Sequence, residues 1–296
     1  MTFSIAGNTE DPKCSAYRRE ASELRQSEPE TLFFVHIPKT AGSSFRHILK
    51  TWFGRELMIF DSHDRNVFAQ AWNGHERPTR AVAGHFGFGL HEAVTSCRPR
   101  YVSLVRDTVE RFVSLYKHVR ETPDHVLHPA AGCDLEQFLV RTLEEPRARG
   151  HTVAVQCFFL TGRRSFEEAL PLVQHAYDLV APTGRLTDFV TELGDRLGRP
   201  TPVIPALNVR PADPELGEAA DRLADRIYEA HGDDQRLYEH VSRCFADRAS
   251  ARPGVHSALA QQGLSVTSST NAALARQRLA GLEASCSCAS PRSGCG

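Results

Sequence analysis

The chain has 296 residues, of which 41% are hydrophobic and 24% are charged, values that are typical of a globular protein. Its formal net charge of −1 gives no basic field that would argue for binding to nucleic acid or to an anionic membrane. No apolar stretch reaches the 18 or so residues that would make a membrane span, and the first 28 residues lack the basic-then-apolar pattern of a secretory signal, so we expect a cytoplasmic protein.

The pattern along the chain predicts a flexible arm over residues 1–29, a compact domain over 30–250 and a disordered, cysteine-containing tail over 251–296. Within the domain, short apolar runs predict strands at 31–37, 80–83, 100–105 and 177–180. Helical periodicity predicts helices at 45–53, 108–119, 135–143, 151–160, 186–197, 215–230 and 235–246. This alternation implies an α/β fold with a central parallel sheet flanked by helices, in which ligands bind at the carboxyl ends of the strands.

The first motif joins the strand at 31–37 to the helix that follows it. It comprises His36-Ile37-Pro38-Lys39-Thr40-Ala41-Gly42-Ser43-Ser44. A helix N-terminus offers unpaired N–H groups and the positive end of the helix dipole to an anion. Gly42 would let the backbone approach that anion, the hydroxyl groups of Thr40, Ser43 and Ser44 would add donors, and Lys39 would add a charge. The alternative is an ordinary strand-to-helix turn with a serine N-cap.

Lys39 stands out because the chain has only four lysines, at positions 13, 39, 50 and 117. The motif is not a Walker A sequence, because Lys39 precedes the glycine instead of following it. The arrangement suits one phosphate and its leaving group better than it suits a triphosphate.

The second motif, YVSLVRDTVERFVSLY, covers residues 101–116. Arg106 is expected where a strand ends, and Ser114 about two turns into the next helix. An arginine at such a position can bind a phosphate through two hydrogen bonds. In the alternative interpretation Asp107 is simply an N-cap, and Arg106 and Arg111 are surface charges.

Together the two motifs resemble those of the sulfotransferases that use 3′-phosphoadenosine-5′-phosphosulfate (PAPS), especially the carbohydrate-type branch that includes heparan sulfate 2-O-sulfotransferase. HIPKTAGSS is similar to the 5′-phosphosulfate loop of that family. VRDTVERFVSLY is similar to its 3′-phosphate motif, commonly R-D-P-x-x-R-x-x-S-x-Y, with Thr108 in place of proline. Fainter similarities follow in the expected order at Gly84-His85-Phe86, at 157–162, at 183–189 and at Leu207-Asn208, so the resemblance covers roughly residues 31–245.

The resemblance implies a P-loop-like sulfotransferase fold, with PAPS as the sulfuryl donor and no metal. It assigns the 5′-phosphosulfate to Lys39, Thr40, Ala41, Gly42, Ser43 and Ser44, and the 3′-phosphate to Arg106 and Ser114. Lys39 would also stabilise the charge that develops on the leaving phosphate oxygen, and His85 would be the catalytic base. His36 and His91 are the other candidates for the base, and Arg163 and Arg164 are either nucleotide contacts or solvated charges.

The expected acceptor is a hydroxyl of a small molecule, a glycolipid or a carbohydrate, with peptide tyrosine as a further possibility and no role for nucleic acid. The sequence does not decide between oxygen and nitrogen as the sulfated atom, and it leaves the oligomeric state open. Two other functions remain as alternatives, a P-loop-type kinase that uses ATP and a non-catalytic nucleotide-binding relative.

Overall fold

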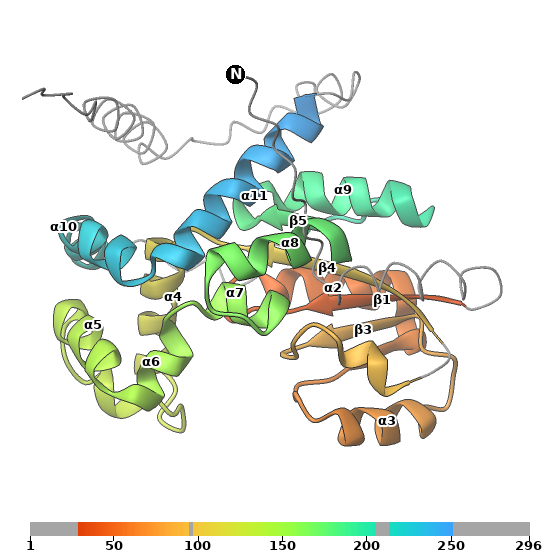
Figure 1. The fold of residues 1–296 in the computed structure, drawn as a ribbon, viewed down its shortest axis with the longest axis horizontal. Coiled ribbons are helices and arrows are strands. Elements are labelled where there is room, and N and C mark those ends of the chain that lie inside the picture. The colour runs from red at the N-terminus through yellow and green to blue at the C-terminus, as the bar shows by residue number, and fades with distance from the viewer. Residues whose placement is uncertain (1–28, 95–96, 205–212, 251–296) are drawn as a thin grey trace, which may run out of the picture. The chain divides into compact units, whose positions relative to one another are not determined.

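The computed structural model describes residues 29–94, 97–204 and 213–250 (Figure 1). The predicted arm up to residue 28, the predicted tail over 251–296 and the Leu207-Asn208 pair lie outside these residues. The predictions made for those segments therefore remain predictions.

A sheet of five strands forms the centre of the domain, and every neighbouring pair in it is parallel. The strands are β1 (Glu30–Val35), β2 (Leu57–Ile59), β3 (Ala81–Gly84), β4 (Arg98–Val105) and β5 (Tyr177–Pro182), in the order β2-β3-β1-β4-β5. This confirms the predicted parallel sheet. Val35 at the end of β1 lies opposite Gly84 on one side and Ser103 on the other, so the loops after β1, β3 and β4 leave the sheet at one edge.

Successive side chains of each strand point to opposite faces of the sheet. Apolar side chains therefore lie on both faces, and helices cover each of them. Leu32 and Phe34 of β1 pack with α2 (Gly42–Phe53) and α9 (Leu186–Leu197). Phe33 and Val35 pack on the other side with α3 (Arg65–Asn73), α7 (Val155–Thr161) and α8 (Phe166–Ala176). The long helix α11 (Gly232–Ser250) contributes residues to both of these clusters.

A third hydrophobic cluster lies among helices alone, at the left of Figure 1. It joins α4 (Thr108–Arg120), α5 (Leu135–Glu144), α6 (Pro146–Thr152) and α10 (Pro214–Ala230). The rings of Phe112 and Phe138 meet at its centre, with their centroids 5.3 Å apart. Short 3-10 helices complete the described elements, at Gly54–Glu56, Leu90–Ala93, His128–Ala130 and Thr183–Arg185.

The sequence-based prediction was wrong in two respects. The single helix predicted over 151–160 is two helices, α6 and α7, separated at Ala154, whose φ of 50° breaks the α-helical path. The elements β2, α3 and α8 were not predicted at all. The omission of β2 matters for the site, because the chain leaving this strand supplies Asp61.

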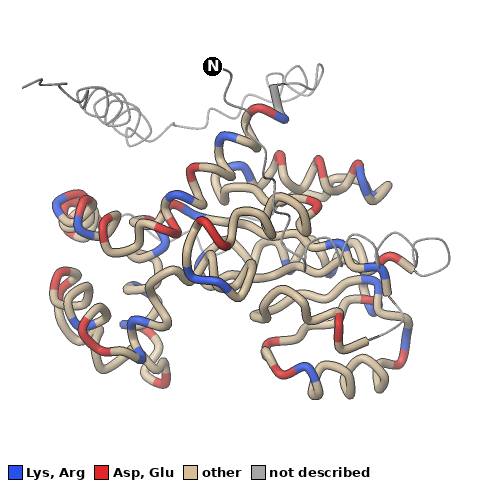
Figure 2. The backbone as a smooth tube through the Cα atoms, in the orientation of Figure 1, with Lys and Arg blue, Asp and Glu red and all other residues tan. Residues whose placement is uncertain are grey.

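Most charged residues lie on helices and loops, and the strands of the sheet carry few residues of either sign (Figure 2). Within the described part of the chain, no helix combines the length and the apolar character that crossing a bilayer requires.

Candidate active site

The loop between β1 and α2 has an unusual backbone. Lys39 has a φ of 71° and Ala41 has a φ of 58°. Two of the three residues at 39–41 therefore adopt the left-handed conformation, although neither is glycine. This conformation is uncommon for residues with a Cβ, and such strain is concentrated at functional sites. Left-handed residues in a loop also form concave arrangements of N–H groups that bind anions. Thr40, between them, is buried, and its hydroxyl donates to the carbonyl oxygen of Ile37 across 2.9 Å. This hydroxyl therefore braces the loop, and a bound anion would meet the main chain of Thr40.

The N-terminus of α2 differs from those of most other helices in the domain. No side chain among the described residues caps it, and its N-cap position is Ala41. Aspartate or serine side chains, in contrast, cap α3, α4, α5, α8 and α10. The alternative of a serine N-cap is therefore excluded, since Ser43 and Ser44 lie inside the first turn of α2. Ser43 is exposed there and Ser44 is buried, so this helix start presents N–H groups and a hydroxyl to a ligand.

Gly42 has a structural requirement that the sequence did not reveal. An ideal Cβ at this position would lie 1.7 Å from Nε2 of His36. The imidazole of His36 therefore occupies the space that any side chain at position 42 would need. Gly42 is expected to let an anion approach the backbone, and in the structure it is also needed to accommodate this ring.

Arg106 follows β4, the strand beside β1, and reaches the loop over residues 36–44, the predicted anion-binding loop (the anion loop). Its Nη1 donates to the carbonyl oxygen of Lys39 across 3.3 Å, and its Nε donates to Glu110 Oε2 across 3.2 Å. Lys39 and Arg106 therefore lie at one edge of the sheet, after the neighbouring strands β1 and β4.

The start of α4 contains both expected and unexpected features. Asp107 caps this helix by accepting from the N–H groups of Val109 and Glu110, and it also accepts from the hydroxyl of Tyr228. Burial raises the pKa of this carboxyl group, and the donated hydrogen bonds oppose the rise. Arg111 is not a surface charge, because its side chain is only 1% exposed.

Ser114 is half-buried on the same helix. It lies four residues beyond Glu110, which in turn lies four residues beyond Arg106, so one face of α4 carries Glu110 and Ser114. Thr108, where the resembling family has proline, donates from both its N–H and its hydroxyl to Gln235 Oε1, at 3.3 and 2.8 Å. A proline could make neither of these hydrogen bonds.

His85 follows β3, on the other side of β1, and its ring is fixed by the main chain. Nδ1 lies 2.7 Å from the carbonyl oxygen of His36. Since a carbonyl oxygen only accepts, Nδ1 carries the proton and Nε2 is left with the lone pair. Burial is the largest influence on the pKa of His85 and lowers it, which keeps the ring neutral near pH 7. His85 thus lies at the same sheet edge as Lys39, with Nε2 as the nitrogen that can accept a proton.

Two charged residues beside His85 were not anticipated from the sequence. Asp61, two residues beyond the end of β2, accepts from the main-chain N–H of His85 across 2.8 Å. Arg46 of α2 donates to the same oxygen, Oδ1 of Asp61. Gly84 makes this approach possible, because a Cβ there would stand 1.8 Å from the carbonyl oxygen of Phe60. Recognising β2 in the sequence would have placed Asp61 at the active edge of the sheet.

The two other histidines considered as bases are placed less favourably. His36 is 7% exposed and its ring stacks on that of His85, with centroids 4.2 Å apart. Burial, together with the neighbouring charges, lowers its pKa to about 2, so it does not accept a proton near neutral pH. Nδ1 of His91 contacts the hydroxyl of Tyr101, and its ring packs on Phe33, in the middle of the sheet.

Arg164 is a structural residue, and Arg163 is exposed. The guanidinium of Arg164 donates to the carbonyl oxygens of Val153 and Gly150, at 2.7 and 3.1 Å, and lies 4.5 Å from the ring centroid of Phe158. It holds α6 and α7 together at their junction.

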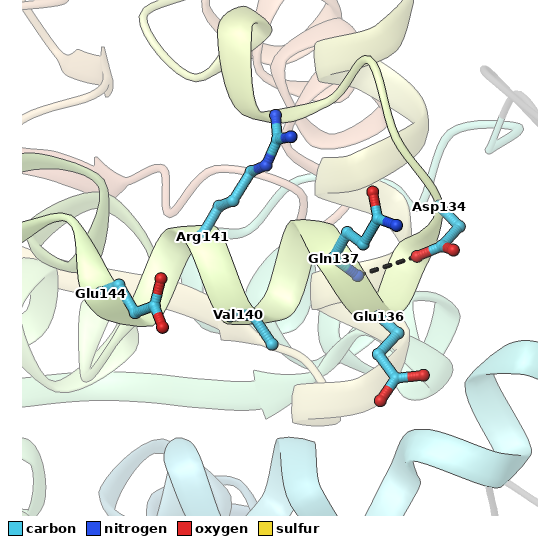
Figure 3. A pocket seen from close by; sticks show the side chains of 6 residues that line it. All are labelled: Asp134, Glu136, Gln137, Val140, Arg141 and Glu144. Atoms are coloured by element: carbon cyan, nitrogen blue, oxygen red, sulfur yellow. Dashed lines mark hydrogen bonds between the residues drawn. The ribbon is translucent and has the colours of Figure 1, made fainter.

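A surface hollow on α5 does not coincide with this site (Figure 3). Its lining consists of Asp134, Glu136, Gln137, Val140, Arg141 and Glu144. Asp134 is committed to capping α5, since it accepts from the N–H of Gln137. With three carboxylates and one arginine, the hollow is unsuited to an anionic ligand.

The comparisons with known proteins find structural similarity alone. No family model matches the chain, and no curated protein matches it. The crystal structure of mouse sulfotransferase SULT7A1 complexed with PAP is similar over 72% of this chain and 89% of that one, with 13% identity and a TM-score of 0.42. The crystal structure of a sulfotransferase from Alicyclobacillus acidocaldarius covers 72% and 97% of the two chains, with 15% identity and a TM-score of 0.44. The function proposed below rests on the residues of the site and not on these distant likenesses.

Proposed function

We propose that this protein is a sulfotransferase of the carbohydrate-type branch, which transfers the sulfuryl group of PAPS to an acceptor hydroxyl and releases adenosine 3′,5′-bisphosphate (PAP). One observation carries the proposal. The anion loop at Lys39, the guanidinium of Arg106 and the base His85 lie together at the ends of three adjacent strands. This placement supplies two anion-binding groups and a proton acceptor at one edge of the sheet.

The hydrogen-bond donors and positive charges of the site suit a nucleotide that carries one anionic group at its 5′ position and another at its 3′ position. The start of α2, uncapped by any described side chain, with Lys39 and Ser43 beside it, suits the 5′-phosphosulfate. Arg106 suits the 3′-phosphate, with Ser114 farther along α4. In the structure Glu110 pairs with Arg106, so a bound phosphate would compete with this carboxylate for the guanidinium.

The proposed chemistry requires the acceptor oxygen, the sulfur and the leaving oxygen to be roughly in line. Bound PAPS would supply the sulfuryl group together with a phosphate as the leaving group. As the acceptor oxygen bonds to sulfur and the sulfur–oxygen bond to the phosphate breaks, His85 Nε2 takes the hydroxyl proton. Lys39 opposes the negative charge left on the phosphate oxygen.

The acceptor is proposed to be a small molecule, a glycolipid or a carbohydrate with a hydroxyl group. A neutral imidazole as base suits such a group, because a hydroxyl must lose its proton during the transfer, whereas an amine that is already unprotonated needs less assistance. The carbonyl of His36 holds the ring of His85 with Nε2 as the proton acceptor.

A kinase using Mg-ATP is the competing function, and two features disfavour it. Lys39 precedes the glycine of its loop, unlike the lysine of a Walker A motif. Asp107, which follows a strand as a magnesium-binding aspartate would, has both carboxylate oxygens engaged by α4 and by Tyr228.

Thermal unfolding with PAP, with AMP or with Mg-ATP would separate the two functions. We expect PAP to raise the melting temperature most, because a ligand stabilises the fold that binds it. Incubation with labelled PAPS and extracts of the source cells would then identify the sulfated product. Stabilisation by Mg-ATP without stabilisation by PAP would overturn the proposal.

A further inference from the structure

The side chain of Gln156 holds the main chain of Arg106 at both of its polar groups. Gln156 Oε1 accepts from the N–H of Arg106 across 2.8 Å, and Gln156 Nε2 donates to its carbonyl oxygen across 2.9 Å. Gln156 is 0% exposed, so water does not compete for either hydrogen bond. One side chain thus fixes both the position and the orientation of this peptide segment.

Gln156 is itself fixed by a buried carboxylate. Asp234 of α11 accepts from the N–H groups of Gln156 and Cys157, across 3.1 and 3.0 Å, and is 0% exposed. Arg111 lies 3.8 Å from this carboxylate and donates to the carbonyl oxygen of Thr152 across 2.7 Å. The guanidinium therefore balances the buried charge. A continuous set of hydrogen bonds leads from α11 through the start of α7 to Arg106.

The chain needs such a contact at Arg106 because the sheet no longer holds it there. The pairing of β4 with β5 ends at Val105, opposite Pro182, and α4 begins only at Thr108. A half-buried peptide between two elements requires other partners for its N–H and C=O groups. Displacement of this peptide would carry the guanidinium away from Lys39, and errors of about 1 Å are costly at sites that bind by geometry.

We propose that Gln156 is a positioning residue, which sets the guanidinium of Arg106 at the distance from Lys39 that a nucleotide with both a 5′-phosphosulfate and a 3′-phosphate requires. The inference rests on the function proposed above. Gln156 does not touch the nucleotide, and it acts on the 3′-phosphate through Arg106 alone. Loss of the Gln156 side chain should therefore weaken the preference for PAP over AMP, because these two nucleotides differ by the 3′-phosphate.

Gln156→Met tests this, because methionine has a similar volume and makes neither hydrogen bond. We expect wild type to bind PAP at least about tenfold more tightly than AMP, and Gln156→Met to lose about threefold or more of that ratio. Thr161→Val is the matched control, since it removes a buried hydrogen bond to Cys157 elsewhere in α7. This control should lower the melting temperature while leaving the PAP-to-AMP ratio unchanged.

A double-mutant cycle with Arg106→Ala separates positioning from general destabilisation. If Gln156 acts through Arg106, Gln156→Met should cause no further loss of the ratio once Arg106 is alanine. A ratio kept by Gln156→Met, despite a lower melting temperature, would overturn the inference and leave the proposed function standing. A wild type without preference for PAP would instead overturn the proposed function.

A second variant serves if Gln156→Met fails to fold. Gln156→Asn keeps the amide group but is one methylene shorter, so it cannot reach both the N–H and the carbonyl oxygen of Arg106. We expect a loss in the PAP-to-AMP ratio with little change in AMP affinity. A ratio equal to that of wild type would contradict the inference.

Discussion

Arg106 donates from Nη1 to the carbonyl oxygen of Lys39 across 3.3 Å, although 67 residues separate them in the chain. The contact follows from the sheet order, because β1 and β4 are parallel neighbours whose ends lie side by side. An arginine and a lysine therefore stand close together over one edge of the sheet, beside the start of α2. A ligand with two anionic groups is the natural partner of such an arrangement.

Arg106→Ala tests the assignment of the 3′-phosphate. We expect the affinity for PAP to fall by at least about tenfold and the affinity for AMP to change little, because a hydrogen bond to a charged group contributes about 1.5–3 kcal/mol. Titration calorimetry with both nucleotides measures this. Arg120→Ala, which removes an arginine at the far end of α4, is the control. Equal losses for PAP and AMP would count against the assignment.

Thr108→Pro introduces the residue that the resembling family commonly has. The first position of a helix accepts proline, so the backbone of α4 should remain intact. Gln235 Oε1 would however lose both of its donors from Thr108, and we expect a cost of about 1 kcal/mol in unfolding free energy. Urea denaturation measures this cost, and PAP affinity should be unchanged. Thr108→Pro in a Gln235→Ala background should cost clearly less, and equal costs in the two backgrounds would exclude this explanation.

The parts of the fold that the sequence predicted are those with strong local signals. Four of the five strands, the parallel sheet and the helices α2, α4, α5, α9, α10 and α11 follow from apolar runs and helical spacing. The brief apolar run of β2, Leu57-Met58-Ile59, was not recognised as a strand, and Met58 is its one buried residue. The break between α6 and α7 depends on a left-handed Ala154, a conformation that alanine rarely adopts.

The same contrast applies to the candidate site. The loop 36–44 could be predicted because its residues are contiguous and follow a clear strand. The role of Gln156 could not be predicted, because its partners Arg106 and Asp234 lie 50 and 78 residues away in the sequence. Asp61 was missed together with β2. The requirement for glycine at position 42 arises from the ring of His36, which becomes its neighbour only when the loop folds.

Gly42→Ala should disturb the pair of stacked histidines. The new Cβ would overlap the ring of His36, and relieving such overpacking typically costs about 1–3 kcal/mol. We expect a lower melting temperature and lower turnover, because His36 stacks on His85. Gly217→Ala is the matched control, since a Cβ there meets nothing within 4 Å and alanine favours the helix.

A second substitution makes the test of Gly42 specific. Replacing His36 with alanine removes the ring that the Cβ of residue 42 would strike. The double variant should therefore be less destabilised than the sum of the two single variants. Strict additivity would show that the ring of His36 is not the reason for the glycine.

His231 should make the fold sensitive to acid. It is 1% exposed, and burial together with nearby Arg111 lowers its pKa to about 3. The unfolded chain, in which a histidine has a pKa near 6.5, then binds more protons than the folded chain between about pH 3 and 6.5. Stability therefore falls as the pH drops below about 6.5, and this residue accounts for about 1.4 kcal/mol at pH 5.5.

His231→Phe isolates this contribution from those of other buried groups. Phenylalanine keeps a ring beside Phe112, whose centroid lies 5.5 Å from that of His231, and it does not titrate. Lowering the pH from 8 to 5.5 should reduce the unfolding free energy of wild type by about 1.4 kcal/mol more than that of the variant. Urea denaturation at both pH values measures the shift, and parallel profiles would contradict the burial of a neutral ring.

Lys39 and His85 should both be needed for turnover, for different reasons. Lys39 lies in the anion loop, so Lys39→Ala should reduce turnover and also weaken the binding of PAPS. The ring of His85 is oriented by His36, with Nε2 as its proton acceptor. His85→Ala should therefore leave PAP affinity nearly intact while turnover falls about 10²–10⁴-fold, the usual contribution of general base catalysis.

The pH dependence of turnover identifies the base more directly. A base acts in its unprotonated form, so the rate with a hydroxyl acceptor should rise with pH through the pKa of His85. Burial lowers this pKa, and the midpoint should thus lie below the usual value of about 6.5, with a constant rate above pH 7. His85→Ala should remove the rise, whereas His75→Ala, at a half-buried histidine outside the site, should keep it. Near-full turnover by His85→Ala with the natural acceptor would exclude His85 as the base.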